Sequence, residues 1–180
     1  RATTSSSPSG HAMELSASLR TTAHVNAVLG YVRELDRYTE WMPLVHSAVP
    51  ESGSAPAAWS VELRARVGPF ARSKRLRMVR TVMDSGAASS SSGAGASAPA
   101  RIVFERRELD GRSHAAWRLE VVVTQTTNSS SAGTHSAAAL ATELTMHLSY
   151  DGRFFASVVE SILQQQIDEG RRHLSALLAA

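Results

Sequence analysis

The last thirty residues, 151–180, carry one long amphipathic pattern, and this pattern constrains the fold more than any other part of the sequence. Apolar residues recur there at helical spacing, namely Phe155, Val159, Ile162, Leu163, Leu174 and Leu177. Gln166, Gly170 and His173 fall on the same stripe. A long helix that buries one face, but interrupts it with an amide, a glycine and an imidazole, is typical of an element that borders a cavity.

The segments before this helix alternate apolar and polar residues, as strands do. We expect strands near residues 11–21, 44–51, 59–67, 75–82, 101–109, 113–125 and 137–150. Two short helices should follow the first strand, with Thr22 and Asp36 as their N-caps. Asp110 and Gly111 predict a type I′ hairpin turn. The sequence therefore predicts an α+β fold, in which a curved antiparallel sheet of about six or seven strands wraps around a long C-terminal helix.

Length and composition suit a single domain, because 180 residues with 43% hydrophobic content can bury a sizeable core. We expect a disordered tail over residues 1–10 and one ligand-binding domain over 11–180. Flexible loops are expected near 85–100 and 126–136, where Ser, Gly and Ala dominate. The chain has no cysteine, which excludes disulfides and thiolate sites and fits a cytoplasmic location. Its seven histidines show no metal-binding spacing, so we expect neither a metal nor a cofactor.

One segment gives the pattern a family likeness. Tyr38, Trp41 and Pro43 form a Tyr-x-x-Trp-x-Pro ending to the second short helix, before a strand. Together with Val67-Gly68-Pro69-Phe70 and the long final helix, this resembles the START-type helix-grip superfamily, which includes polyketide cyclases/dehydrases, lipid-transport proteins and birch-pollen-allergen-like proteins. The resemblance covers most of the chain from His11 onward. It implies a cavity between the sheet and the final helix, and it implies apolar ligands without naming one.

Candidate ligand-binding residues are of two kinds. The aromatic and apolar candidates are Trp117, Phe155, Phe104 and Met146, because large inward-facing side chains line apolar pockets. Gln166 is a candidate hydrogen-bond donor or acceptor to a ligand, with Gly170 making room for it. The competing interpretation is that Gly170 permits close packing and that backbone groups satisfy Gln166.

Two arginines are further candidates. If the alternation holds, Arg80 and Arg106 share the inner faces of their strands. A buried guanidinium needs a partner, which Glu108, Glu143 or a ligand carboxylate could supply. The alternative is that strand twist carries both side chains to the rim of the sheet.

Three functions remain open. The leading hypothesis is binding or transport of a lipid, quinone or polyketide-like molecule, in a cavity on the order of a few hundred Å³ or more. The second is a polyketide cyclase, aromatase or dehydratase on the same fold, for which no acid–base pair stands out and no catalytic residue is assigned. The third is an interaction module, whose basic stretch Arg64–Arg80 faces an anionic membrane surface or a protein partner. Scarce aromatic residues in that stretch disfavour nucleic acid, and the oligomeric state does not follow from the pattern.

Overall fold

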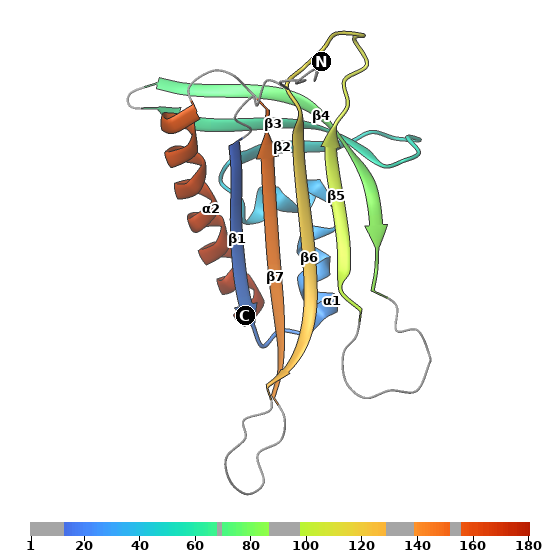
Figure 1. Cartoon of the computed structure of the whole chain (residues 1–180), viewed down its shortest axis with the longest axis vertical. Coiled ribbons are helices and arrows are strands. Elements are labelled where there is room, and N and C mark those ends of the chain that lie inside the picture. The colour runs from blue at the N-terminus through green and yellow to red at the C-terminus, as the bar shows by residue number, and fades with distance from the viewer. Residues whose placement is uncertain (1–12, 68–69, 87–97, 129–138, 152–155) are drawn as a thin grey trace, which may run out of the picture.

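The computed structural model of the protein describes residues 13–67, 70–86, 98–128, 139–151 and 156–180. The tail expected over residues 1–10 lies outside these ranges, and so do most of the two loops expected near 85–100 and 126–136. Figure 1 shows a tall, bent sheet with one long helix lying along it.

Seven antiparallel strands form a single sheet in the order β1-β7-β6-β5-β4-β3-β2. Their bounds are β1 Met13–Thr21, β2 Val45–Pro50, β3 Ala58–Val67, β4 Phe70–Asp84, β5 Ala100–Arg106, β6 Trp117–Asn128 and β7 Ala139–Tyr150. The chain runs from β2 to β7 by neighbouring pairings, and β7 closes against β1. A register shift between Arg80 and Val82 marks an irregularity where β4 pairs with β5, and irregularities of this kind bend a sheet.

Three helices complete the architecture: α1 Val25–Val32, the 3₁₀ helix η1 Leu35–Glu40, and α2 Ala156–Ala179. The α+β class, the curved sheet and the long final helix are therefore confirmed. The expected N-cap at Thr22 is wrong, because α1 begins later and the His24 imidazole accepts the hydrogen bond from the Asn26 amide. The cap expected at Asp36 is also wrong, since Asp36 lies inside η1 and its carboxylate accepts from Trp59 Nε1 at 3.0 Å.

The connection between β5 and β6 also differs from the prediction. Strand β5 ends at Arg106 and β6 begins at Trp117, so the loop is much longer than a two-residue turn. Gly111 does have the positive φ that the turn prediction required, at 69°. However, the Asp110 carboxylate accepts from the Arg112 amide at 3.1 Å and contacts His114 Nε2 at 2.9 Å. These local hydrogen bonds stabilise a wider loop in place of a tight hairpin.

The core lies between the sheet and the helices. The segment that joins α1 to β2 crosses this space, and its buried aromatic side chains are tied to backbone: Tyr38 Oη donates to Val32 O at 3.0 Å and Trp41 Nε1 to Tyr31 O at 3.2 Å. Helix α2 passes closely over the same segment at Gly170, where a Cβ would lie 2.9 Å from Met42 Sδ. The glycine therefore sets how near α2 approaches, and it serves helix packing at this point.

Candidate functional site

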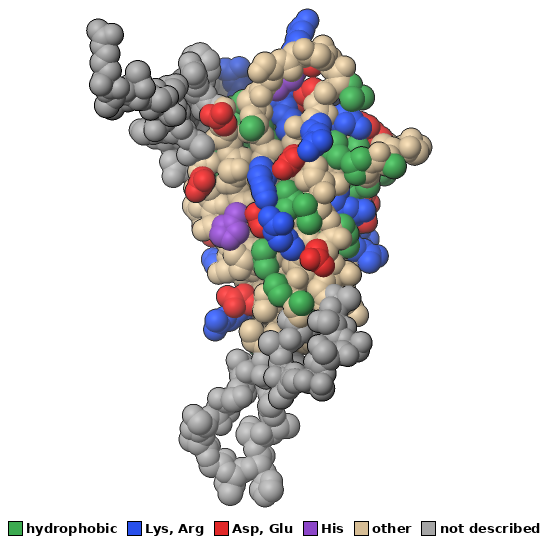
Figure 2. Space-filling model, turned by 45° about the vertical axis from the view of Figure 1, so that its right-hand side comes forward, with side chains coloured by type: hydrophobic (Ala, Val, Ile, Leu, Met, Phe, Trp, Pro, Cys, Tyr) green, Lys and Arg blue, Asp and Glu red, His purple; other side chains and the backbone are tan. Residues whose placement is uncertain are grey.

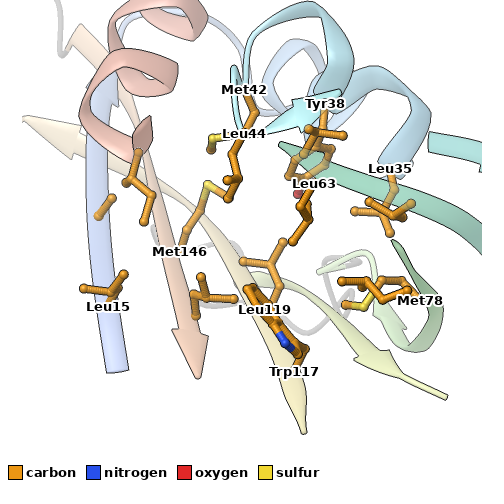
Figure 3. Close-up of a pocket in the computed structure, with 16 residues that line it drawn as sticks. Leu15, Leu35, Tyr38, Met42, Leu44, Leu63, Met78, Trp117, Leu119 and Met146 are labelled. Carbon is orange, nitrogen blue, oxygen red and sulfur yellow. The ribbon is translucent and has the colours of Figure 1, made fainter. Parts of the chain in front are cut away.

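An apolar cavity lies between the concave face of the sheet, η1 and α2. Sixteen residues line it, and Figure 3 shows their side chains converging on a common space from opposite sides. The lining residues are Leu15, Ala17, Leu35, Tyr38, Met42, Leu44, Val45, Val61, Leu63, Leu76, Met78, Trp117, Leu119, Met146, Leu148 and Ile167. Alternation along each strand explains the set, since residues two apart share a face of the sheet.

The cavity is smaller than the sequence interpretation requires. It contains about 720 Å³ of unoccupied space when the part open to solvent is counted, but the centres of water molecules reach only about 90 Å³ of it. That is room for a small apolar group, since a dry cavity of about 150 Å³ already holds a whole benzene molecule. Met42, Met78 and Met146 line the walls. Methionine side chains change rotamer easily, so a larger ligand can be admitted by moving them.

Polar groups on the wall are few among the described residues. The Tyr38 hydroxyl donates to Val32 O at 3.0 Å, and burial raises the pKa of Tyr38 far above its usual range. It is therefore held neutral and bonded to backbone. The indole of Trp117 differs, because its buried Nε1 meets no hydrogen-bond acceptor in the described part of the chain. A buried donor without an acceptor is uncommon in proteins and requires an explanation.

The predicted apolar site residues separate into three groups. Trp117 and Met146 line the cavity. Phe104 does not line it but is fully buried beside Trp59 and Tyr38, with ring centroids 5.7 Å and 6.3 Å away. Phe155 lies outside the described residues. Among the described side chains of α2, Ile167 reaches the cavity, whereas its neighbour Gln166 is absent from the lining.

The two candidate arginines have protein partners outside the cavity lining. Arg80 Nη1 lies 2.7 Å from Glu34 Oε1 and 2.8 Å from Arg33 O. Arg106 has a side chain only 8% exposed, and its Nε lies 2.6 Å from Glu108 Oε1. The partner of Arg106 is one that the sequence suggested, while the partner of Arg80 comes from the segment between α1 and η1. Both guanidinium groups are compensated within the chain.

The expected basic surface is neutralised only in part. Among the described residues, four of the seven basic residues between 64 and 80 form ion pairs, and these pairs are Arg64–Glu62, Arg75–Glu62, Arg77–Glu51 and Arg80–Glu34. Because Arg64 and Arg75 share Glu62, three carboxylates offset these four charges. Figure 2 shows acidic and basic side chains interleaved on the face that it presents. Glu51 and Glu34 lie outside the basic stretch in the sequence, so a count of charges along that stretch cannot reveal them.

Sequence reasoning missed Lys74, which lies at one end of the cavity. Its Nζ is 5.5 Å from the centroid of the Trp117 ring and 5.1 Å from that of Tyr150. The signal was present in the sequence, because Lys74 precedes Leu76 and Met78 at the two-residue spacing of one strand face.

Known proteins resemble this chain in structure but not in sequence. No protein-family model matches the sequence, and no curated protein is significantly similar to it. The Zhui aromatase/cyclase from a Streptomyces species superposes with a TM-score of 0.57 at 10% identity, covering 94% of each chain. A START superfamily protein from Mycobacterium smegmatis superposes with a TM-score of 0.54 at 9% identity, covering 92% of this chain and 97% of that one.

The chain has the START-type helix-grip fold. The resemblance drawn from the Tyr38–Pro43 segment and the final helix is thus confirmed at the level of the fold. The di-domain ARO/CYC protein BexL is also similar, with a TM-score of 0.53 at 13% identity over 96% of this chain. This helix-grip chain spans 52% of the length of BexL.

Two further observations bear on function. Of the helices in the described ranges, none is long and apolar enough to cross a membrane. Among the described residues there is also no group of three or more His, Asp or Glu side chains placed to hold a metal ion.

Proposed function

We propose that this protein binds an apolar small molecule in the cavity between the sheet and α2. The observation that carries the proposal is the cavity wall, which is apolar except for two residues, Tyr38 and Trp117. Because the Tyr38 hydroxyl is already bonded to Val32 O, the wall favours hydrocarbon over polar solutes. A ligand would gain about 0.8 kcal/mol for each methylene group transferred from water.

A cyclase or aromatase of polyketide type is the alternative function. The similarity in fold to Zhui and BexL favours it. Against it, the described lining residues include a single titratable side chain, Tyr38, whose proton is held by burial. General acid–base catalysis needs a group that exchanges protons near neutral pH at the reacting atoms. The wall of the cavity therefore supports binding better than it supports proton transfer.

The test is displacement of an apolar fluorophore from the purified protein by a panel of fatty acids, alcohols, quinones and aromatic polyketides. Binding of the fluorophore and its competitive displacement by at least one class is the expected result. Failure of the fluorophore and of every compound to bind, measured directly by calorimetry, would contradict the proposal. Conversion of a bound polyketide into a cyclised product, followed by mass spectrometry, would replace it with the enzymatic alternative.

A further inference from the structure

Lys74 is the single lysine in a chain whose other eighteen Lys and Arg residues are all arginine. On β4 it pairs with Leu63, a cavity residue of β3. Its ammonium extends towards the Trp117 and Tyr150 rings, which face each other across β6 and β7 with centroids 4.7 Å apart. A cation within about 6 Å of an aromatic ring centroid is attracted by the ring face. Lys74 is not a lining residue, but its ammonium lies against the Trp117 ring, which lines the cavity at this end.

The charges around this ammonium do not balance. Burial is the largest cause that lowers the pKa of Lys74, and the positive charge of Arg106 nearby lowers it further. The nearby carboxylate of Glu108 is bonded to Arg106 Nε at 2.6 Å and also accepts from the Arg77 amide at 3.3 Å. Within the described ranges Lys74 has neither an ion pair nor a hydrogen bond. Among the described residues two cations thus share one acid, and a partly desolvated positive charge without a partner is costly.

A second unsatisfied donor lies at the same end. Trp117 is 8% exposed and lines the cavity, and its Nε1–H meets no acceptor among the described residues. A buried donor left in this way is destabilising. The ammonium and the indole N–H belong to neighbouring groups, since Lys74 Nζ is 5.5 Å from the Trp117 ring centroid. One anion with two acceptor oxygens can satisfy both.

We propose that this end of the cavity binds the carboxylate of an amphipathic acid, with one oxygen on Lys74 Nζ and the other on Trp117 Nε1. The apolar body of the acid then fills the cavity, so this inference rests on the proposed function and narrows its ligand class. The excess of positive charge favours an anion over a neutral carbonyl, because a carbonyl would leave the ammonium uncompensated. The same excess disfavours cationic amphiphiles.

The test compares octanoate with octan-1-ol, which share a chain length and differ in charge. Calorimetry at neutral pH should give the wild type at least about a tenfold preference for the acid. In Lys74→Met the ratio of acid to alcohol affinity should fall to about one, and Lys74→Arg should retain the preference. Trp117→Phe, which keeps the ring and removes the N–H, should reduce the ratio. Arg75→Met is the matched control, because it removes one charge at the next position, where the exposed side chain bonds Glu62.

The outcomes separate this inference from the proposed function. If octan-1-ol binds and octanoate binds no better, the cavity binds apolar molecules and the carboxylate site is wrong. If neither compound binds although the apolar fluorophore does, the carboxylate site is wrong and the proposed function stands; if the fluorophore fails as well, both fail. Equal loss of preference in Arg75→Met and Lys74→Met would show a general charge effect and would also overturn the site.

A second measurement uses the wild-type chain and does not depend on any variant folding. Lys74 is the single lysine of this sequence, so its labelling by an amine-reactive reagent can be read beside that of the protein's α-amino group. Saturating octanoate should slow labelling of Lys74, read by peptide mass spectrometry, while labelling of the α-amino group serves as the internal reference. An unchanged rate at Lys74 under saturating octanoate would overturn the proposal.

Discussion

Filling the cavity from its own wall should stabilise the protein and abolish ligand binding. Ala17 on β1 is the smallest lining residue, and it lies beside Met146, its register partner on β7, in the same wall of the cavity. Ala17→Leu places a larger apolar side chain into the space of about 90 Å³ that water centres can reach. Filling that volume would recover up to about 2 kcal/mol, at roughly 24 cal/mol per Å³. For a chain of this length the melting temperature should rise by up to about 4–8 °C.

The assay is thermal unfolding together with fluorophore binding, for Ala17→Leu and for Ser16→Leu as the matched control. Ser16 is the adjacent residue on the exposed face of β1, so the same leucine there should change neither the cavity nor the binding. A closed core would respond in the opposite way, because overpacking costs about 1–3 kcal/mol. Destabilisation of Ala17→Leu by that amount, with binding retained, would refute the assignment of an open apolar cavity at this position.

Three further perturbations test other parts of the structure. Gly170→Ala should raise the free energy of unfolding by less than the ~1 kcal/mol expected from helix propensity, because the new Cβ would lie 2.9 Å from Met42 Sδ. Displacement of the Met42 side chain from the cavity wall should also weaken fluorophore binding. The full gain in unfolding free energy with unchanged binding would contradict this. Trp59→Phe should lower the free energy of unfolding by about 1–3 kcal/mol, since Trp59 Nε1 donates to the Asp36 carboxylate at 3.0 Å. Denaturant titrations should show a smaller loss when Trp59→Phe is made in an Asp36→Ala background, and an equal loss in both backgrounds would argue against the bond. A hydrogen bond from Arg101 holds the pKa of Glu120 below its usual 4.5, so the contribution of Glu120 to stability is present above that pH and is lost as pH falls through the lowered pKa. The difference in unfolding free energy between wild type and Glu120→Gln should therefore narrow as the pH falls below 4.5. A constant difference would contradict this.

The sequence contains enough information for the architecture but less for the site. Helical spacing in residues 151–180 and alternation in the strands depend on local geometry, so the curved sheet and α2 could be predicted. The rotation of α2 about its axis could not be predicted from the sequence, because that rotation depends on the close approach of Gly170 to Trp41 and Met42. That rotation brings Ile167 to the cavity in place of Gln166.

The polar candidates show the same limit of local reasoning. Alternation placed Arg80 and Arg106 on an inner face, and the sequence suggested Glu108, the partner of Arg106, but not the partner of Arg80. Glu34 reaches Arg80 from a segment 46 residues away, so no spacing rule identifies it. Lys74 was recoverable from the same alternation, but its significance depends on the rings of β6 and β7, which only the sheet register brings to it.

Whether the cavity holds an apolar small molecule can be measured on the protein itself. The measurement is native against denaturing mass spectrometry of the wild-type protein purified from its own host, with Ala17→Leu prepared in parallel. We expect an added mass on the native wild type, released on denaturation as an extractable apolar compound and missing from Ala17→Leu. An unliganded wild-type protein that also binds nothing from the compound panel would contradict it.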